Sequence, residues 1–338
     1  MKNALLSCFL GALILVFSAV TTQATPMKDS DVDFSGLAQF IYSWDQDNGD
    51  DQLDITRLQV NLSAKPADKV RVFATFDFSG NGSSVLSGAP IPGARYSLMD
   101  GTADGNVVDA YADLSYIKNV TFRVGQFPLP ISYELNTAPY DLETVQYNQG
   151  VGMFGIRDRG IIIFGDPSPK VSVSGWLVNG AGAISGATND TNDKNDYGLQ
   201  LDLFPVDFFS VKLWGTWSDQ TETEAHGAGL DYAERGLHLF GEFNQANETN
   251  CGVFGGFIVD CDYRQWYVNA SQRIPHTEVQ AVARYDFFKF TIPAGSATRK
   301  ITTFGFNWDF EKNAKLQVMK NFLKGDNDSL DVQLSTRF

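Results

Sequence analysis

The sequence predicts an all-β protein, a closed transmembrane antiparallel β-barrel of about 16 strands with short periplasmic turns and long external loops. Two observations lead to this prediction. Beyond residue 24 the chain breaks into segments with apolar residues at alternate positions, and short connections alternate with long ones. No stretch there approaches about 18 consecutive apolar residues, so a second transmembrane helix is excluded.

The first 24 residues have the three parts of a secretory signal peptide. Lys2 supplies the positive start, LLSCFLGALILVFSAV the apolar core, and TTQA a small-residue cleavage site. Polar residues follow directly, which argues against a permanent membrane anchor. We therefore expect a signal peptide over residues 1–24, cleaved after Ala24, and a single barrel domain over residues 25–338.

The first predicted strands show the alternation clearly. In DFSGLAQFIYSW, Phe34, Phe40 and Trp44 share one face, and Gln39 and Ser43 share the other. ITRLQVNLSA, VRVFATFDF and VVDAYADLSY repeat this pattern, and similar segments continue almost to the last residue. AKPADK and GDPSPK are typical of tight turns, whereas DQDNGDDQ and GAISGATNDTNDKND are typical of longer loops.

The chemistry of the two faces favours a barrel in lipid over a soluble β-sandwich. The apolar face is continuous and rich in Phe, Tyr and Trp, while the opposite face carries Arg, Asp, Gln and Asn. A dry core would have to pair each of these polar groups. Apolar residues outside and polar residues inside instead predict a water-filled lumen, closed because an open edge would leave backbone groups unpaired in hydrocarbon.

Several segments resemble the phosphate-selective porin O and P family of Gram-negative outer membranes. They include TRLQVNLSAKP, VVDAYADLSY followed by FRVGQFPLPIS, RDRGIIIFG, VSGWLVNGAG and TTFGFNWDFEKNAKLQV, in the family's order and over most of the mature chain. The resemblance implies a 16-stranded barrel in the outer membrane, a homotrimer, and a long third loop that narrows the lumen. Phe338 ends a final alternating segment and resembles the signal that the barrel-assembly machinery recognises.

The stretch from Pro128 to Ile156 matches the position of that third loop. If it folds inward, it brings four residues near the constriction: Tyr133, Glu134, Asp141 and Glu143. The alternative is that the stretch is an exposed surface loop.

The alternation also assigns charged residues to the predicted lumen. These pore-lining candidates are Arg57, Arg71, Asp77, Asp109, Asp113, Arg123, Arg159, Lys212, Glu242, Arg284 and Asp286. Because both signs share the face, we expect cross-strand pairing instead of the row of cations that phosphate selectivity needs.

The chain is acidic, with a formal net charge of -14, which argues against nucleic acid as a partner. We predict an outer-membrane porin for passive diffusion of small hydrophilic solutes or ions, nonspecific or mildly cation-preferring. One alternative is an anion- or phosphate-selective channel, as the family name suggests. A second is a scaffold or conduit that holds a partner protein in the barrel.

Two local motifs have alternative interpretations. Cys251 and Cys261 are an even pair in an exported chain, which predicts a disulfide that closes one loop; a metal site would lack a nearby His. The acidic DQDNGDD invites a calcium interpretation, but it lacks the EF-hand spacing. We expect a solvated external loop that divalent ions bridge to lipopolysaccharide, and we expect no cofactor.

An enzyme on a barrel scaffold is a further alternative. The three histidines, His226, His238 and His276, fall on different segments, and no G-x-S-x-G or H-E-x-x-H motif occurs. The sequence therefore does not predict an enzyme. The expected surroundings of the mature protein are outer-membrane lipid and lipopolysaccharide.

Overall fold

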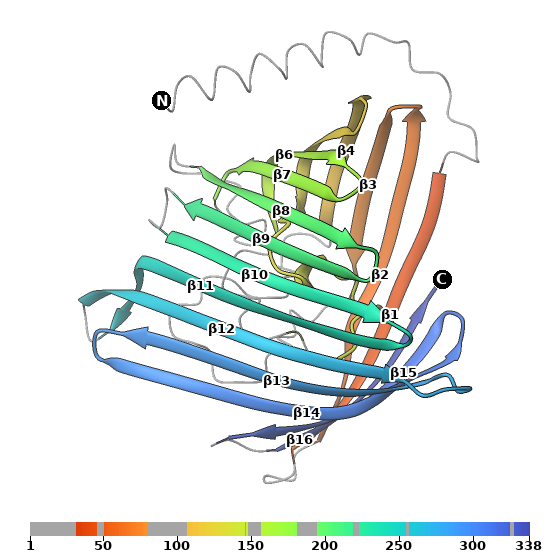
Figure 1. Ribbon diagram of the computed structural model, residues 1–338, viewed down its shortest axis with the longest axis vertical. Helices are drawn as coiled ribbons and strands as arrows, with labels where there is room; N and C mark the ends of the chain where they lie inside the picture. Colours follow the sequence, from red (N-terminus) through yellow and green to blue (C-terminus); the bar gives the residue numbers. More distant parts are fainter. Residues whose placement is uncertain are drawn as a thin grey trace.

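The computed structural model is a closed antiparallel barrel, in which each strand pairs with its neighbours in sequence and β1 pairs with β16 (Figure 1). The structure describes residues 32–45, 51–79, 107–145, 147, 157–180, 195–218, 223–254, 257–324 and 328–338. The predicted signal peptide lies outside these residues. Within the described residues, no helix is both long and apolar enough to cross a membrane.

The barrel has the predicted sixteen strands. They are β1 (Val32–Asp45), β2 (Asp51–Ala67), β3 (Val70–Asp77), β4 (Val107–Ile117), β5 (Val120–Pro128), β6 (Arg157–Ser168), β7 (Val171–Val178), β8 (Asp196–Val206), β9 (Phe209–Ser218), β10 (Thr223–Glu234), β11 (Leu237–Phe254), β12 (Phe257–Arg273), β13 (Val279–Ile292), β14 (Gly295–Glu311), β15 (Ala314–Leu323) and β16 (Ser329–Arg337).

The chain ends complete the closure between β1 and β16. Leu37 lies opposite Arg337, and the ladder continues to the last residue. The backbone N–H of Gly36 donates to the Phe338 carbonyl (2.8 Å), and that of Phe338 donates to the Gly36 carbonyl (3.2 Å). A Cβ at position 36 would lie 2.8 Å from the Gln59 carbonyl oxygen and would also meet the Phe338 ring, so glycine suits this close approach.

The alternation of the sequence becomes an apolar outside and a largely polar inside. On β1, Phe40, Tyr42 and Trp44 are exposed while Gln39 is fully buried. In its pairing with β1, β2 contains a bulge opposite Gln39 and Phe40. Thr56 and Arg57 are therefore both buried, although Ile55 and Leu58 on either side of them are both exposed.

The two ends of the barrel carry connections of different lengths. Turns of two residues join β2 to β3, β4 to β5, β6 to β7, β8 to β9, β10 to β11 and β14 to β15, and β12 joins β13 at the same end. The opposite end carries the long connections, among them residues 78–106 and 129–156. Outer-membrane barrels have short periplasmic turns and longer external loops, which orients this barrel.

Candidate functional site in the barrel lumen

The lumen is the candidate site, and register places ten of the eleven predicted pore-lining residues on its face. Three of the ten are Asp113, Arg123 and Lys212. Asp113 lies opposite Arg123, and Lys212 lies opposite Asp202, which was not among the eleven. The remaining inward residues among the candidates are Arg57, Arg71, Asp77, Asp109, Glu242, Arg284 and Asp286, most of them buried or half-buried.

Arg159 is the exception, and its assignment to the lumen was wrong. It lies opposite Gln126, and its Nε donates to Gln126 Oε1 (3.0 Å) on the outer face. The inward positions of β6 are Asp158 and Ile162, which are both buried. The run Ile161–Ile163 is apolar on both faces of the strand, so the sequence contains no alternation there that could assign a face.

Opposite charges on the wall pair with each other, as the mixed signs of the sequence suggest. Arg123 holds both carboxylate oxygens of Asp113, at 2.7 and 2.9 Å, and its guanidinium lies 3.9 Å from the centre of the Tyr111 ring. Arg157 donates to Asp109 (2.8 Å). Sequence reasoning missed Arg157 because it stands at the very start of β6, next to the long loop.

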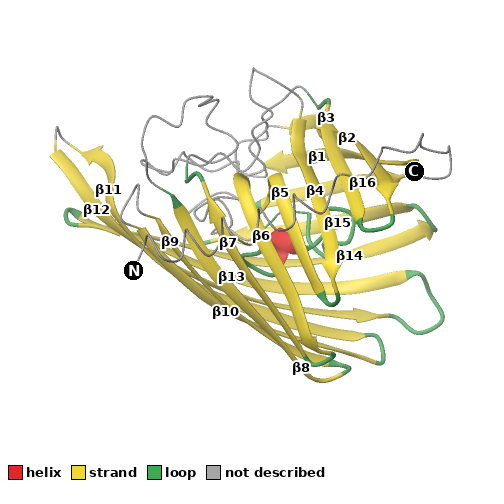
Figure 2. Ribbon diagram, turned by 90° about the horizontal axis from the view of Figure 1, so that it is seen from above, coloured by secondary structure: helices red, strands yellow, loops and turns green. Residues whose placement is uncertain are grey.

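Residues 129–145 fold into the barrel, as the resemblance implies for the third loop. Figure 2 shows its helical turn, Glu134–Asn136, inside the ring of strands. Ser132 has a positive φ of 66° where the loop bends. Its hydroxyl and the backbone N–H of Tyr133 both donate to Glu242 Oε2 on β11, at 2.9 and 3.0 Å. Burial, then nearby carboxylates led by Asp231, raise the pKa of the Tyr133 phenol above its ordinary value.

Glu134 points to the wall and not to open lumen. It is 1% exposed and pairs with Arg284 on β13. Arg284 Nη1 also donates to Thr144 (2.9 Å), and its Nε donates to Asp286 (2.6 Å). One arginine therefore connects both arms of the loop to the wall.

Glu143 is the second attachment of the loop. Its carboxylate meets His238 Nδ1 at 2.8 Å and accepts from Asn269 (2.5 Å) and from Ser271 (2.7 Å). The second ring nitrogen of His238 lies 2.8 Å from Asp231. This histidine thus connects the loop to β10 and β11.

The third attachment lies near the periplasmic end. Lys315 on β15, only 5% exposed, donates to the backbone carbonyls of Tyr140 and Leu142. Asp141 is exposed and lies 3.5 Å from Arg337. Of the four predicted constriction residues, Asp141 presents its side chain most openly. The sequence could not identify Lys315 or His238, because their roles depend on the loop that packs over them.

A cavity of about 590 Å³ lies between the loop and the wall at this end. Acidic residues from the loop and from β14 line it together with basic residues from β12, β15 and β16. The charged lining residues are Asp141, Glu143, Arg273, Glu278, Asp309, Glu311, Lys312, Lys315 and Arg337. The described lumen thus contains water-accessible space lined by both signs of charge.

Part of the inner face is apolar, contrary to the expectation of a polar lumen throughout. Leu129 and Ile131 of the loop pack into a buried cluster that crosses from β5 to β13. Its largest other members are Phe127, Ile162, Trp176, Trp214, Tyr263, Phe288 and Phe290. This cluster stabilises the start of the loop against the wall through burial of apolar area.

Cys251 and Cys261 do not close a long loop. β11 and β12 pair on both sides of an irregularity between Glu248 and Gly252 and end with Phe254 opposite Phe257, so only residues 255–256 connect them. Cys261 is disulfide-bonded. The side chain of Cys251 lies outside the described residues, so the Cys251–Cys261 pairing stays a prediction.

The histidines are far from a hydrolase arrangement in the described part of the chain. His276 lies exposed in the β12–β13 turn, His226 is exposed on β10, and His238 bridges two carboxylates. Residues 46–50 of the acidic loop lie outside the described residues, so its ion-bridging role is untested.

Comparisons with known proteins agree with this architecture. A family model described as Gram-negative porin matches residues 11–328. No curated protein matches the chain significantly.

Solved structures share the fold at low sequence identity. An outer-membrane channel, DcaP of Acinetobacter baumannii, has a TM-score of 0.62 at 13% identity and covers 94% of this chain and 100% of its own. An anion-selective porin from Comamonas acidovorans has 0.60 at 14%, covering 91% and 99%. OmpT of Vibrio cholerae in its trimer form has 0.63 at 9%, covering 91% and 99%. On the strength of the family match over most of its length, this chain belongs to the Gram-negative porins, outer-membrane channels for passive diffusion.

Proposed function

We propose that this porin passes small hydrophilic solutes and ions with little selectivity and a mild preference for cations. The observation that carries the proposal is the pairing of charges on the inner face. Arg123 with Asp113 and Lys212 with Asp202 present neutral pairs to a passing ion. Such pairs offer neither sign a continuous row of binding groups.

A mild cation preference follows from the surplus of carboxylates around the buried cations. Arg284 faces both Glu134 and Asp286, and His238 faces both Glu143 and Asp231. Arg284 and the His238 ring are thus each flanked by two carboxylates, and His238 carries a positive charge only when it is protonated. The excess negative charge lowers the energy of a cation in the lumen relative to that of an anion.

The inward loop acts as the size filter in this proposal. Its attachments through Arg284, Glu143 and Lys315 hold it across the lumen against one wall. The same loop argues against a conduit for a partner protein, which needs an unobstructed barrel.

Anion or phosphate selectivity remains the second candidate, and one observation favours it. Arg57 and Arg71 on neighbouring strands have neutral partners, Gln39 at 2.6 Å and Ser63 at 3.2 Å. These two arginines give this part of the described wall cations whose hydrogen bonds go to neutral side chains. The resemblance to phosphate-selective porins and the anion selectivity of the Comamonas acidovorans protein are consistent with this alternative.

The reversal potential in a KCl gradient across a planar bilayer decides between the two. A cation-to-anion permeability ratio near or moderately above one supports the proposal. Strong anion selectivity, with block by phosphate, would establish the alternative.

A homotrimer is also proposed. The outer faces of β3 and β4 carry small side chains, Ala74, Ala110 and Ala112, which allow close approach of another copy. The Vibrio cholerae protein of the same fold has a trimer form. Cross-linking of the native membrane tests this: a ladder that ends at three chains supports it, and monomer alone contradicts it.

A further inference from the structure

A column of stacked planar side chains stands on the inner wall from β3 to β6. Phe73 of β3 lies directly opposite Tyr111 of β4, and their ring centroids are 5.1 Å apart at an interplanar angle of 29°. The Arg123 guanidinium of β5 lies 3.9 Å from the centre of the Tyr111 ring and 5.1 Å from that of Phe164 on β6. These distances are typical of stacked rings and of cations held over rings. We call Phe73, Tyr111, Arg123 and Phe164 the stacked column.

The stacked column faces the lumen. Tyr111 shares its face of β4 with Asp109 and Asp113, and the register extends this face to Phe73. Tyr111 and Phe164 pack against the buried cluster that also contains the start of the inward loop. Phe73 and Tyr111 are nevertheless only half-buried. A ring that remains in contact with water gains free energy when an apolar group covers it, so the column offers a binding surface to the apolar part of a solute.

The column ends at Phe73, where the next strand carries a small side chain. Ser63 of β2 lies directly opposite Phe73 and is too small to cover the face of the ring. Arg71 stands two residues before Phe73 on β3, about 7 Å along the strand. Its Nη2 donates to the Ser63 hydroxyl (3.2 Å), which places the guanidinium beside the space over Ser63. We call Phe73, Ser63 and Arg71 the ring slot.

The charges around the ring slot favour a solute with one negative charge. Asp113 lies directly opposite Arg71, but Arg123 holds both of its carboxylate oxygens, at 2.7 and 2.9 Å. Ser63 is neutral and does not compensate the charge of Arg71. On the other side of Ser63 lies Asp33 of β1, directly opposite in the register. This carboxylate repels a second negative charge on a solute that Arg71 has bound.

We propose that the ring slot is a weak binding site for small planar aromatic monocarboxylates that pass through the pore. The ring of such a solute stacks on Phe73 over Ser63 and extends the column by one member. Its carboxylate accepts hydrogen bonds from the Arg71 guanidinium and the Ser63 hydroxyl. Binding stays weak, because a solute that binds tightly does not leave a channel. This inference rests on the proposed function, since the solute reaches the slot through the water-filled lumen.

The test uses benzoate as the probe and cyclohexanecarboxylate as its match. The two acids carry the same charge and have nearly the same size, but only benzoate has a planar aromatic ring. Ligand-observed NMR measures the binding of each acid to purified, folded protein in detergent. Block of the single-channel current by each acid measures the same binding in planar bilayers.

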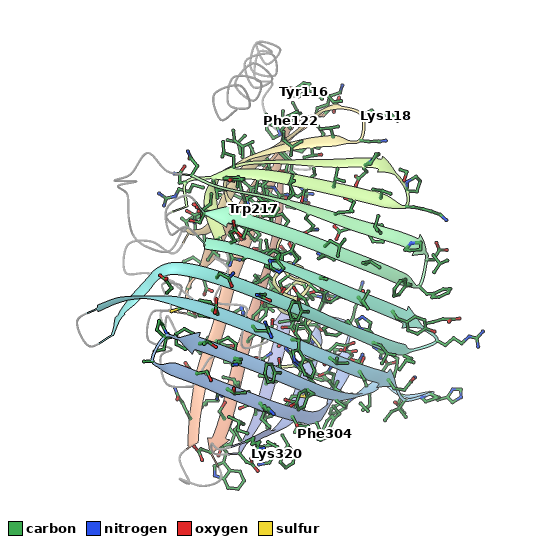
Figure 3. The ribbon with its side chains drawn as sticks, turned by 60° about the vertical axis from the view of Figure 1, so that its left-hand side comes forward. Tyr116, Lys118, Phe122, Trp217, Phe304 and Lys320 are labelled. Carbon is green, nitrogen blue, oxygen red and sulfur yellow. The ribbon has the colours of Figure 1, made fainter. Side chains whose placement is uncertain are left out.

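The slot variants are Phe73→Leu and Arg71→Gln, and each has a control with the same substitution on the outer face of the barrel. Phe304→Leu is the control for the ring, and Figure 3 shows Phe304 at the barrel surface. Arg159→Gln is the control for the cation. Heat-modifiable gel mobility confirms that each variant is a folded barrel.

We expect the wild type and both controls to bind benzoate roughly three- to tenfold more tightly than cyclohexanecarboxylate, the preference that ring stacking supplies. Phe73→Leu should abolish this preference, and Arg71→Gln should weaken the binding of both acids about tenfold, as the loss of a hydrogen bond to a charged group predicts. Equal binding of the two acids by the wild type would overturn the proposal. A preference that persists in Phe73→Leu, or undiminished binding by Arg71→Gln, would overturn it as well.

Two further outcomes separate the slot from a general anion site and from the channel itself. Phthalate, a planar aromatic dianion, should bind no more tightly than benzoate; tighter binding of phthalate or of inorganic phosphate would overturn the proposal, because charge alone would then select the solute. Protein that prefers benzoate in detergent but shows no open steps would contradict the diffusion channel and support the slot. Open steps that both acids block equally would contradict the slot and leave the channel standing.

Discussion

Replacement of Arg284 by glutamine should release the inward loop while leaving the barrel closed. The guanidinium is buried and holds Glu134, Asp286 and Thr144 together. Its removal leaves two buried carboxylates without their cation, and the loss of one partner from a buried ion pair costs about 3–5 kcal/mol. Since about 1.4 kcal/mol is a factor of ten, the docked population of the loop falls relative to open states by roughly 10²- to 10³-fold or more.

The assay is single-channel recording in planar bilayers. Arg284→Gln should show larger or strongly fluctuating conductance, because the loop no longer holds one position. Arg159→Gln, on the outer face of the same barrel, is the matched control and should behave as the wild type. Neutralisation of the whole cluster, with Glu134→Gln and Asp286→Asn added to Arg284→Gln, should restore quiet steps, because no unpaired charge remains buried. Wild-type conductance and noise in Arg284→Gln alone would refute the reasoning.

Four further predictions concern selectivity, loop docking, pH and processing. Arg123→Gln should move the reversal potential towards cations and Asp113→Asn towards anions, because each change exposes the other member of the pair; equal shifts of the same sign would contradict this. Glu143→Ala removes the acceptor for four side chains and should raise protease cleavage of the loop in folded protein; unchanged protection would count against the anchor. Burial and nearby carboxylates raise the pKa of Tyr133 above its ordinary 10.0, so the folded loop favours the protonated phenol. Docking of the inward loop is therefore at full strength below pH about 10 and weakens as the pH rises further. Channel noise recorded as a function of pH measures this. Cleavage after Ala24 predicts a mature N-terminus of TPMKD, and Edman sequencing or intact mass showing residues 1–24 retained would disprove it.

The sequence predicted the barrel because its alternation extends through nearly every strand. It failed where that alternation stopped. Ile161–Ile163 is apolar on both faces since Ile162 joins the internal cluster, and Arg159 was therefore assigned to the wrong side. A shift of one residue reverses every side chain of a strand.

The attachments of the loop depend on contacts between residues far apart in the chain. Glu143 meets His238 and Ser271, and Lys315 meets the Tyr140 carbonyl. No local pattern encodes these partners, because each contact joins residues that lie about 95 to 175 positions apart in the sequence. The sequence therefore predicted that the loop folds inward, through resemblance, but not that Glu134 and Glu143 point to the wall.

The measurement that tests the central claim most directly is the conductance of single channels of the purified protein as KCl concentration rises. A water-filled pore with paired wall charges predicts stable open steps whose conductance grows in proportion to the conductivity of the solution. Conductance that saturates at low salt would show a specific ion-binding site, and folded protein without open steps would contradict a diffusion channel altogether.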